Sequence, residues 1–227
     1  VALLLHISVP DMFPLAEGAF ADFNEDRVIT TEDAVALLLH ISMPDMFPLA
    51  KPTKRIFCEH CMQTVEFRPW DGAAISASGH YFLKEDVVLT ASMSIKSGVD
   101  VVIDLNGHNL TSISGRVFYV IKGSSLTIID SSTTPGTLTG GSTAGGGVIY
   151  VESGAEDLRA TLNLYDATIT STCADTTNNG GALYIGNHAD VTITRATING
   201  GKAKQGGAIF VATNSVVTLN SGLITGG

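Results

Sequence analysis

A unit of short β-rich runs recurs along the last two thirds of the chain and constrains the fold more than any other feature. Clear copies begin at Arg116, Gly147, Gly181 and Gly207, which are 31, 34 and 26 residues apart. Each copy holds three runs rich in Val, Ile, Leu, Thr and Tyr, separated by Gly, Asn, Asp and Ser. Constant strands with variable spacing are typical of a solenoid with insertions at its turns. One unit cannot bury its own inward side chains, so the units must stack.

The repeated runs also carry a resemblance to a known fold. Gly181-Ala182-Leu183-Tyr184-Ile185 is followed by Val191-Thr192-Ile193 and then by Ala196-Thr197-Ile198. This pattern resembles the right-handed parallel β-helix of pectate lyases, polygalacturonases and many bacterial surface proteins. The competing fold is an immunoglobulin-like sandwich, which does not require the same motif to return in order. We therefore predict a mostly β protein whose residues 79–227 form a right-handed parallel β-helix, a solenoid that the end of the sequence cuts.

The first fifty residues contain an internal duplication. Residues 1–15 and 35–49 match at every position except Val9 and Met43, at an offset of 34. Recurrence identifies the opening apolar stretch as a structural repeat rather than a signal peptide. Eight acidic residues and one basic residue stand in residues 1–50, a balance that disfavours nucleic acid as a partner. No run of 18 apolar residues occurs, so the sequence predicts no membrane span.

Residues 22–33 follow the ligand order of an EF-hand-type calcium loop. Such a loop supplies side-chain oxygens at positions 1, 3, 5, 9 and 12, and a backbone carbonyl at position 7. A helix is predicted over residues 31–42, with Thr31 as its cap and Ala34, Val35, Leu38 and Leu39 as a core stripe. The predicted Ca²⁺ ligands are Asp22, Asn24, Asp26, Val28, Thr30 and Asp33.

The loop and the duplicated helix together resemble a dockerin, with the first of its two loops cut off. The resemblance implies a calcium-dependent module over residues 1–50, a cohesin-type protein domain as partner, and an extracellular, secreted or cell-surface location. It also implies that Thr31, Glu32 and the side near His40 contact the partner. Glu25 and Arg27 stand where dockerins often carry Gly, and a left-handed non-Gly residue costs about 1 kcal/mol. Weak calcium binding, or none, is therefore the alternative.

A pair of cysteines lies between the two predicted modules, in residues 51–78, which we interpret as a linker and a cap. Cys58 and Cys61 form a CxxC motif that allows a disulfide, half of a zinc site or plain thiols. A second pair 12–20 residues further on is missing, and His60 and His80 are the other candidate ligands. On the sequence alone we expect no stoichiometric zinc.

Two features of the repeats bear on function. Asp130 and Asp166 end equivalent strands of two units and are the catalytic candidates, with turn or surface residues as the alternative. An aromatic residue also recurs at one strand position, as a sugar-binding ladder or as a stacked row: Tyr119, Tyr150, Tyr184 and Phe210. The sequence thus favours a dockerin-anchored adhesin or polysaccharide-binding scaffold. The alternative is a dockerin-borne polysaccharide lyase or glycoside hydrolase.

Overall fold

The computed structural model describes residues 29–42, 53–141, 146–174 and 176–226. The chain divides into two compact units, residues 1–52 and residues 53–227. Four predicted calcium ligands lie outside the described residues: Asp22, Asn24, Asp26 and Val28.

The described part of the first unit is the helix α2 (Thr31–Ser42), with the bounds that the sequence predicts. Its cap is Thr30, whose hydroxyl oxygen accepts the N–H of Glu32 at 3.2 Å. The carboxylate of Asp33 accepts the N–H of Thr30 at 2.7 Å, so the two side chains form a reciprocal capping box. The prediction of Thr31 as the cap is wrong because Thr31 is already helical, and only the preceding residue can reach the unpaired N–H groups.

Burial on α2 follows the capping turn and not the predicted apolar stripe. Asp33 and Ala34 are its buried residues. Val35 and Leu38 are 54% and 56% exposed, so the prediction that both are core residues is wrong. With Ile41, also exposed, they leave an apolar face on the helix.

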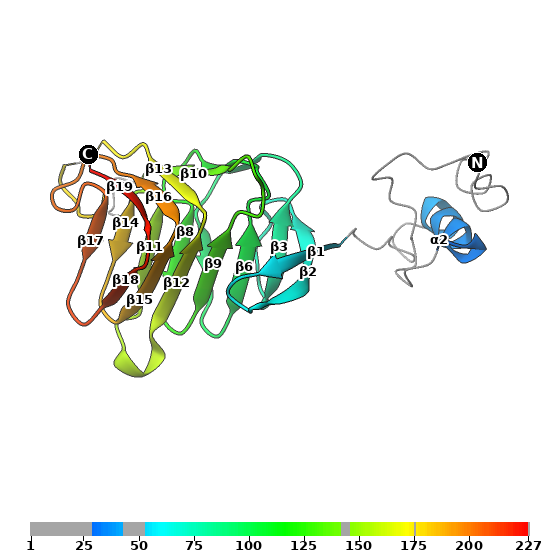
Figure 1. Cartoon of the computed structure of the whole chain (residues 1–227), viewed down its shortest axis with the longest axis horizontal. Coiled ribbons are helices and arrows are strands. Elements are labelled where there is room, and N and C mark those ends of the chain that lie inside the picture. Colours follow the sequence, from blue (N-terminus) through cyan, green and yellow to red (C-terminus); the bar gives the residue numbers. More distant parts are fainter. Residues whose placement is uncertain (1–28, 43–52, 142–145, 175, 227) are drawn as a thin grey trace. The chain divides into compact units, whose positions relative to one another are not determined.

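The second unit consists mainly of three sheets, counted over the described residues 53–226 (Figure 1). Sheet I contains β1 (Lys54–Cys58), β2 (Gln63–Trp70), β3 (Gly79–Leu83), β6 (Asp100–Asp104), β9 (Ser125–Ile129), β12 (Ala160–Tyr165), β15 (Ala189–Thr194) and β18 (Val216–Leu219). Sheet II contains β4 (Val87–Leu89), β7 (Leu110–Ser112), β10 (Thr137–Gly140), β13 (Thr168–Ser171), β16 (Ala196–Asn199) and β19 (Gly222–Thr225). Sheet III contains β5 (Met93–Ile95), β8 (Phe118–Ile121), β11 (Ile149–Glu152), β14 (Leu183–Ile185) and β17 (Ile209–Val211).

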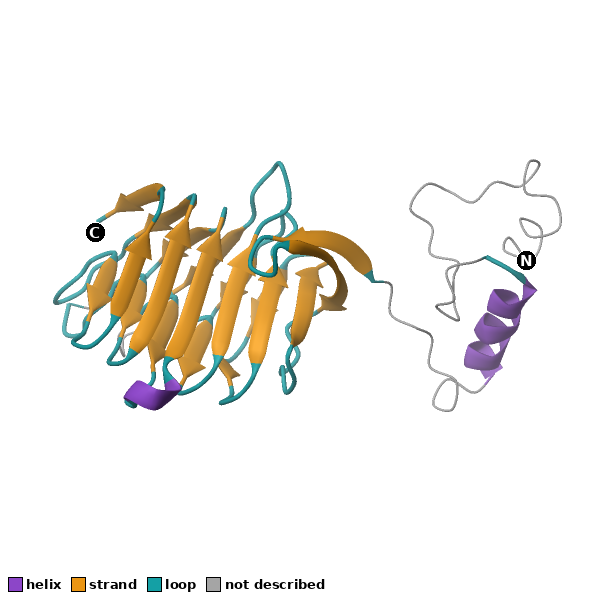
Figure 2. Cartoon of the chain, turned by 60° about the horizontal axis from the view of Figure 1, so that its bottom comes forward, coloured by secondary structure: helices purple, strands orange, loops and turns teal. Residues whose placement is uncertain are grey.

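From β3 onward the chain visits sheets I, II and III in turn, and every pairing is parallel. One circuit through the three sheets makes a coil, and successive coils lie side by side in both views (Figures 1 and 2). A sandwich of the immunoglobulin kind has antiparallel sheets, so that alternative is excluded. The predicted mostly β fold with stacked repeats is confirmed, and the arrangement is compatible with a solenoid.

The interior is filled by columns of side chains that the register brings together. Leu126, Leu162 and Val191 are register partners on β9, β12 and β15 and are almost completely buried. Fully burying an aliphatic side chain of this size contributes roughly 1.5–3 kcal/mol. The alternation of β-strand side chains sends the intervening residues outward. The core therefore repeats once per coil, as the sequence pattern predicts.

The β1–β2 hairpin stands apart from the coils because it is antiparallel, although β2 pairs in parallel with β3. β1 begins at Lys54, inside the stretch interpreted as a linker. Trp70 packs into the main core and is 6% exposed. Phe67 instead joins a second apolar cluster with Val102, whose neighbours on β6 face the interior. The hairpin thus both closes the first coil and covers part of the outer face of sheet I.

Candidate functional site

An aromatic row crosses the outer face of sheet III. Tyr119, Tyr150, Tyr184 and Phe210 are register partners on four successive strands. Their ring centroids are 4.8, 4.5 and 5.1 Å apart in that order, with interplanar angles of 26°, 5° and 26°. These are stacked rings at the spacing of neighbouring strands. The structure therefore agrees with the stacked-row interpretation of these residues.

Stacking covers the ring faces inside the row and leaves a face open only where the row stops. On β5 the register partner of Tyr119 is Ser94. The short Ser94 side chain is exposed and cannot cover an aromatic ring. The face of Tyr119 that points away from Tyr150 is therefore not covered by a further member of the row.

Arg116 lies beside this end of the row. Its guanidinium carbon is 5.3 Å from the Tyr119 centroid and 4.8 Å from the Tyr150 centroid. With the 4.8 Å between the two rings, these distances form a nearly equilateral triangle. The guanidinium thus lies alongside both rings and not on the far face of Tyr119. Burial lowers the pKa of Arg116, but an arginine stays protonated in proteins, so the end of the row carries a cation.

The open face of Tyr119 borders a surface hollow of about 400 Å³. Its lining combines one aromatic ring, one cation and several hydroxyl groups: Ser92, Ser94, Ser114, Gly115, Arg116 and Tyr119. A second hollow of about 390 Å³ shares Ser92 and Ser94 and extends to Asp71, Thr90 and Lys96. The two hollows adjoin at Ser92 and Ser94, and Tyr119 lines the first of them.

A carboxylate, that of Glu152, also lies beside the aromatic row. The Tyr150 hydroxyl donates a hydrogen bond to the Glu152 carboxylate. Burial, followed by that hydrogen bond, raises the pKa of Tyr150, so its phenol stays protonated. A guanidinium and a carboxylate thus lie on the same outer face. Together with hydroxyl groups and an open ring face, they can recognise a ligand that has an apolar face and many hydroxyls.

The structure gives the catalytic candidate Asp130 a supporting role at a turn. Asp130 is 8% exposed. Its carboxylate accepts the backbone N–H groups of Gly107, Ser132 and Gly136 at 3.0, 3.0 and 2.6 Å. Burial raises the pKa of Asp130, and this effect is larger than the lowering by the three hydrogen bonds. Every one of these contacts holds the chain at the turn between sheets I and II.

The other candidate, Asp166, is a turn residue with a positive φ of 54°. Arg195 donates to both of its carboxylate oxygens, at 2.9 and 2.8 Å, and also binds Glu59 at the tip of the β1–β2 hairpin. Ile129 and Tyr165 are register partners, so Asp130 and Asp166 do follow equivalent strand positions, as predicted. The two carboxylates nevertheless bind different partners, backbone N–H groups for Asp130 and Arg195 for Asp166.

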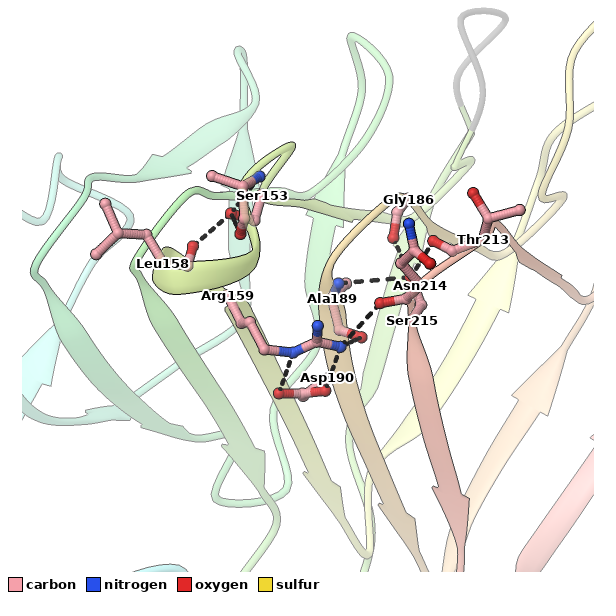
Figure 3. A network of polar contacts seen from close by, with 10 residues as sticks. Ser153, Leu158, Arg159, Gly186, Ala189, Asp190, Thr213, Asn214 and Ser215 are labelled. Carbon is pink, nitrogen blue, oxygen red and sulfur yellow. Dashed lines mark hydrogen bonds and ion pairs between the residues drawn. The ribbon is translucent and has the colours of Figure 1, made fainter.

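A third charged group, Arg159, connects three coils (Figure 3). Its guanidinium donates to both carboxylate oxygens of Asp190 at 2.8 Å and to the backbone carbonyl of Asn214 at 3.0 Å. Arg159 follows the short 3-10 helix η1 (Glu156–Leu158). This geometry ties β12 to the next two strands of sheet I and is structural.

Both cysteines of the CxxC motif lie close to a histidine from another strand. Cys58 ends β1, Cys61 lies in the hairpin loop and His80 lies on β3. Cys61 Sγ is 3.0 Å from His80 Nε2, and the three potential ligand atoms lie within 4.8 Å of one another. Burial and the neighbouring Cys58 raise the pKa of Cys61 to about 11, and burial lowers the pKa of His80. The sequence offered no reason to choose His80 over His60, the other candidate ligand; the pairing of β2 with β3 does.

The partner-binding residues implied by the dockerin resemblance lie on α2. Thr31 and Glu32 are exposed and His40 is partly exposed. Of the predicted calcium ligands, Thr30 and Asp33 are described and are hydrogen-bonded to each other. In the structure the Asp33 carboxylate therefore caps the start of α2.

Comparison of the chain with family models, with curated proteins and with solved structures gave no match. Within the described residues, no helix is long and apolar enough to cross a membrane. Interpretation of the site therefore depends on its geometry.

Proposed function

We propose that this chain belongs to an extracellular modular protein whose β-solenoid binds polysaccharide and whose N-terminal module anchors it to a cohesin-type domain with Ca²⁺. The observation that carries the first half is the face of Tyr119 that the aromatic row leaves uncovered, beside a hollow lined by serine hydroxyls and Arg116. Parallel crossover connections are right-handed in about 98% of cases, so we further propose that the solenoid is a right-handed parallel β-helix.

Sugar recognition at this hollow would use two complementary contacts. The C–H face of a pyranose packs on the open face of Tyr119, because an aromatic ring has a negative face that attracts polarised hydrogens. Serine hydroxyls and the Arg116 guanidinium then supply hydrogen bonds to sugar hydroxyls or to a uronate. Arg116 and Lys96, which line the two adjoining hollows, outnumber the one lining carboxylate, Asp71, and suit an acidic chain such as polygalacturonate.

The anchoring half is supported by the duplicated segment, the ligand order of residues 22–33 and the exposed positions of Thr31 and Glu32. The exposed apolar side chains of Val35, Leu38 and Ile41 add a surface that a protein partner would cover. This half is tested by titration calorimetry with Ca²⁺. Asp22→Ala and Asp33→Ala should abolish the heat of binding, and no heat in the parent chain would contradict it.

The polysaccharide proposal is tested by affinity electrophoresis in gels that contain pectin, polygalacturonate, xylan or host glycans. Tyr119→Ala should weaken the affinity roughly two- to tenfold, since an aromatic packing contact is worth roughly 0.5–1.5 kcal/mol. Tyr184→Ala is the matched control, because both faces of Tyr184 are already covered inside the row. Equal loss in both variants, or no retardation of the parent chain, would refute the assignment of the hollow.

The alternative is a polysaccharide lyase or glycoside hydrolase, for which the equivalent positions of Asp130 and Asp166 are the supporting observation. Incubation with the same polysaccharides and Ca²⁺ distinguishes the two functions. We expect no release of unsaturated or reducing ends. Release that Asp130→Asn or Asp166→Asn abolishes would replace the binding function with catalysis.

A further inference from the structure

The β1–β2 hairpin brings together a donor set that the proposed function does not use. Cys58 is completely buried, and Cys61 and His80 are partly exposed. We propose that Cys58 Sγ, Cys61 Sγ and His80 Nε2 bind one Zn²⁺ ion, which fastens the hairpin to β3. This proposal is independent of polysaccharide or cohesin binding.

The distances suit a tetrahedral ion. Zn–S bonds of about 2.3 Å and Zn–N bonds of about 2.0 Å place neighbouring ligand atoms roughly 3.5–3.8 Å apart. The three ligand atoms lie within 4.8 Å of one another, and the Cys61–His80 pair is already at 3.0 Å. Rotations of the side chains alone can therefore close the triangle around an ion.

The local structure prepares two of the ligands, Cys58 and His80. The backbone N–H of Cys61 donates to Cys58 Sγ at 3.4 Å, and such a hydrogen bond stabilises a thiolate. The ring of Phe67 packs edge-on against His80 at a centroid distance of 5.0 Å, which restricts the orientation of the imidazole. Two thiolates and one imidazole favour Zn²⁺ over Ca²⁺ or Mg²⁺, which prefer oxygen ligands.

The exposed side of the cluster leaves the fourth position accessible. His60 lies in the loop between the two cysteines and is partly exposed, but it does not belong to the group of three. Water or His60 would complete the tetrahedron. The ion would then enter from the solvent side of Cys61 and His80, with Cys58 as the buried ligand.

The ion would stabilise β1, the strand of the hairpin that is not paired with a coil strand. Behind the ligands, Ile56 and Phe67 cover Phe82, Val102 and Ile129 on the outer face of sheet I. β1 pairs only with β2 among the described strands. A bond from Cys58 to His80 through zinc would cross-link the hairpin to the first coil and keep these apolar side chains out of water.

The test measures the metal content of the full chain, purified under reducing conditions from zinc-supplemented medium. We expect one zinc per chain by elemental analysis, and cobalt substitution should give the charge-transfer absorption of thiolate-bound Co²⁺. Cys61→Ser and His80→Ala should each lose the metal and the absorption. Cys173→Ser and His108→Ala are the matched controls and should keep both, because neither residue belongs to the cluster.

Because a ligand variant can fail to fold, the parent chain is also tested by chelation. Removal of zinc should expose the hairpin amides of residues 54–70 to hydrogen exchange, and added zinc should restore their protection. The proposal is overturned if the reduced parent chain takes up no zinc. It is equally overturned if His80→Ala retains zinc, or if mass spectrometry finds Cys58 and Cys61 joined as a disulfide in the purified protein.

Discussion

Gly181→Ala tests the stacking of the coils directly. The backbone of Gly181 does not have the positive φ that would demand glycine, so alanine is allowed by its local conformation. A Cβ built there would lie 1.9 Å from the carbonyl oxygen of Gly207 in the next coil. Ordinary van der Waals contact for a Cβ begins at 3.4 Å. The two coils must therefore separate locally by about 1.5 Å, because the clashing atom belongs to a backbone and cannot rotate away.

The hydrogen bonds across the same contact give the magnitude. The N–H groups of Gly181, Ala182 and Leu183 donate to the next coil at 2.9 Å each. A separation of about 1.5 Å breaks all three, and a backbone hydrogen bond is worth about 1 kcal/mol net, so the free energy of unfolding should fall by about 3 kcal/mol. Gly154→Ala is the control: Gly154 has a positive φ of 71° but nothing within 4 Å of the added Cβ. The free energy of unfolding of Gly154→Ala should fall by only the cost of a left-handed alanine, roughly 1–2 kcal/mol.

Urea unfolding followed by circular dichroism measures both variants. The midpoint of Gly181→Ala should fall below that of Gly154→Ala. If Gly181→Ala were as stable as the parent chain, or more stable than Gly154→Ala, the coils would not approach as closely as the structure shows. Close packing of the coils at Gly181 would then not contribute to the stability of the fold.

Two further predictions concern charged groups. Hydrogen bonds from Asn109, with a smaller contribution from His108, lower the pKa of Asp86. The ionised carboxylate therefore stabilises the folded chain fully above the usual pKa of 3.8, and this stabilisation is lost as the pH falls through the lowered pKa. Nuclear magnetic resonance titration should find the Asp86 carboxyl ionised below pH 3.8, and Asp86→Asn should flatten the dependence of stability on pH in that acid range. Glu59→Gln removes the carboxylate that pairs with Arg195 between the hairpin and the coils. The side chains of Glu59 and Arg195 are 37% and 47% exposed, so the substitution should lower the free energy of unfolding by less than about 1 kcal/mol. Thermal unfolding should show this difference at low salt and no difference at high salt.

The repeating part of the fold could be read from the sequence because each coil repeats one burial pattern. Gly147, Gly181 and Gly207 open equivalent units, and the carbonyl contacts of the first two explain why a small residue recurs there. The bounds of α2 were also predicted, although the residue that caps the helix is Thr30 and not Thr31, and its partner in the capping box is Asp33. In both cases the residues that define an element are close to it in the sequence.

The contacts of the candidate sites were harder to predict because they join residues far apart in the chain. Asp166 was left without a partner by the sequence, yet Arg195 lies beside it after the turn of the next coil. The Glu59–Arg195 contact spans 136 residues and depends on where the hairpin folds back. The exposure of Val35 and Leu38 was also not predicted, because an apolar stripe shows that a helix face can be buried and does not show that another element covers it.

A solenoid also restricts where a binding site can form. Register places like residues on top of one another about 4.8 Å apart, so an aromatic column covers its own ring faces. A recognition surface must then arise where a column is interrupted. Ser94 interrupts the aromatic column below Tyr119 and opens the ring face there. The antiparallel hairpin interrupts the coil pattern and brings Cys61 to His80. Both candidate sites thus lie at breaks in the repeat, which is why the periodicity that predicts the fold does not by itself predict the sites.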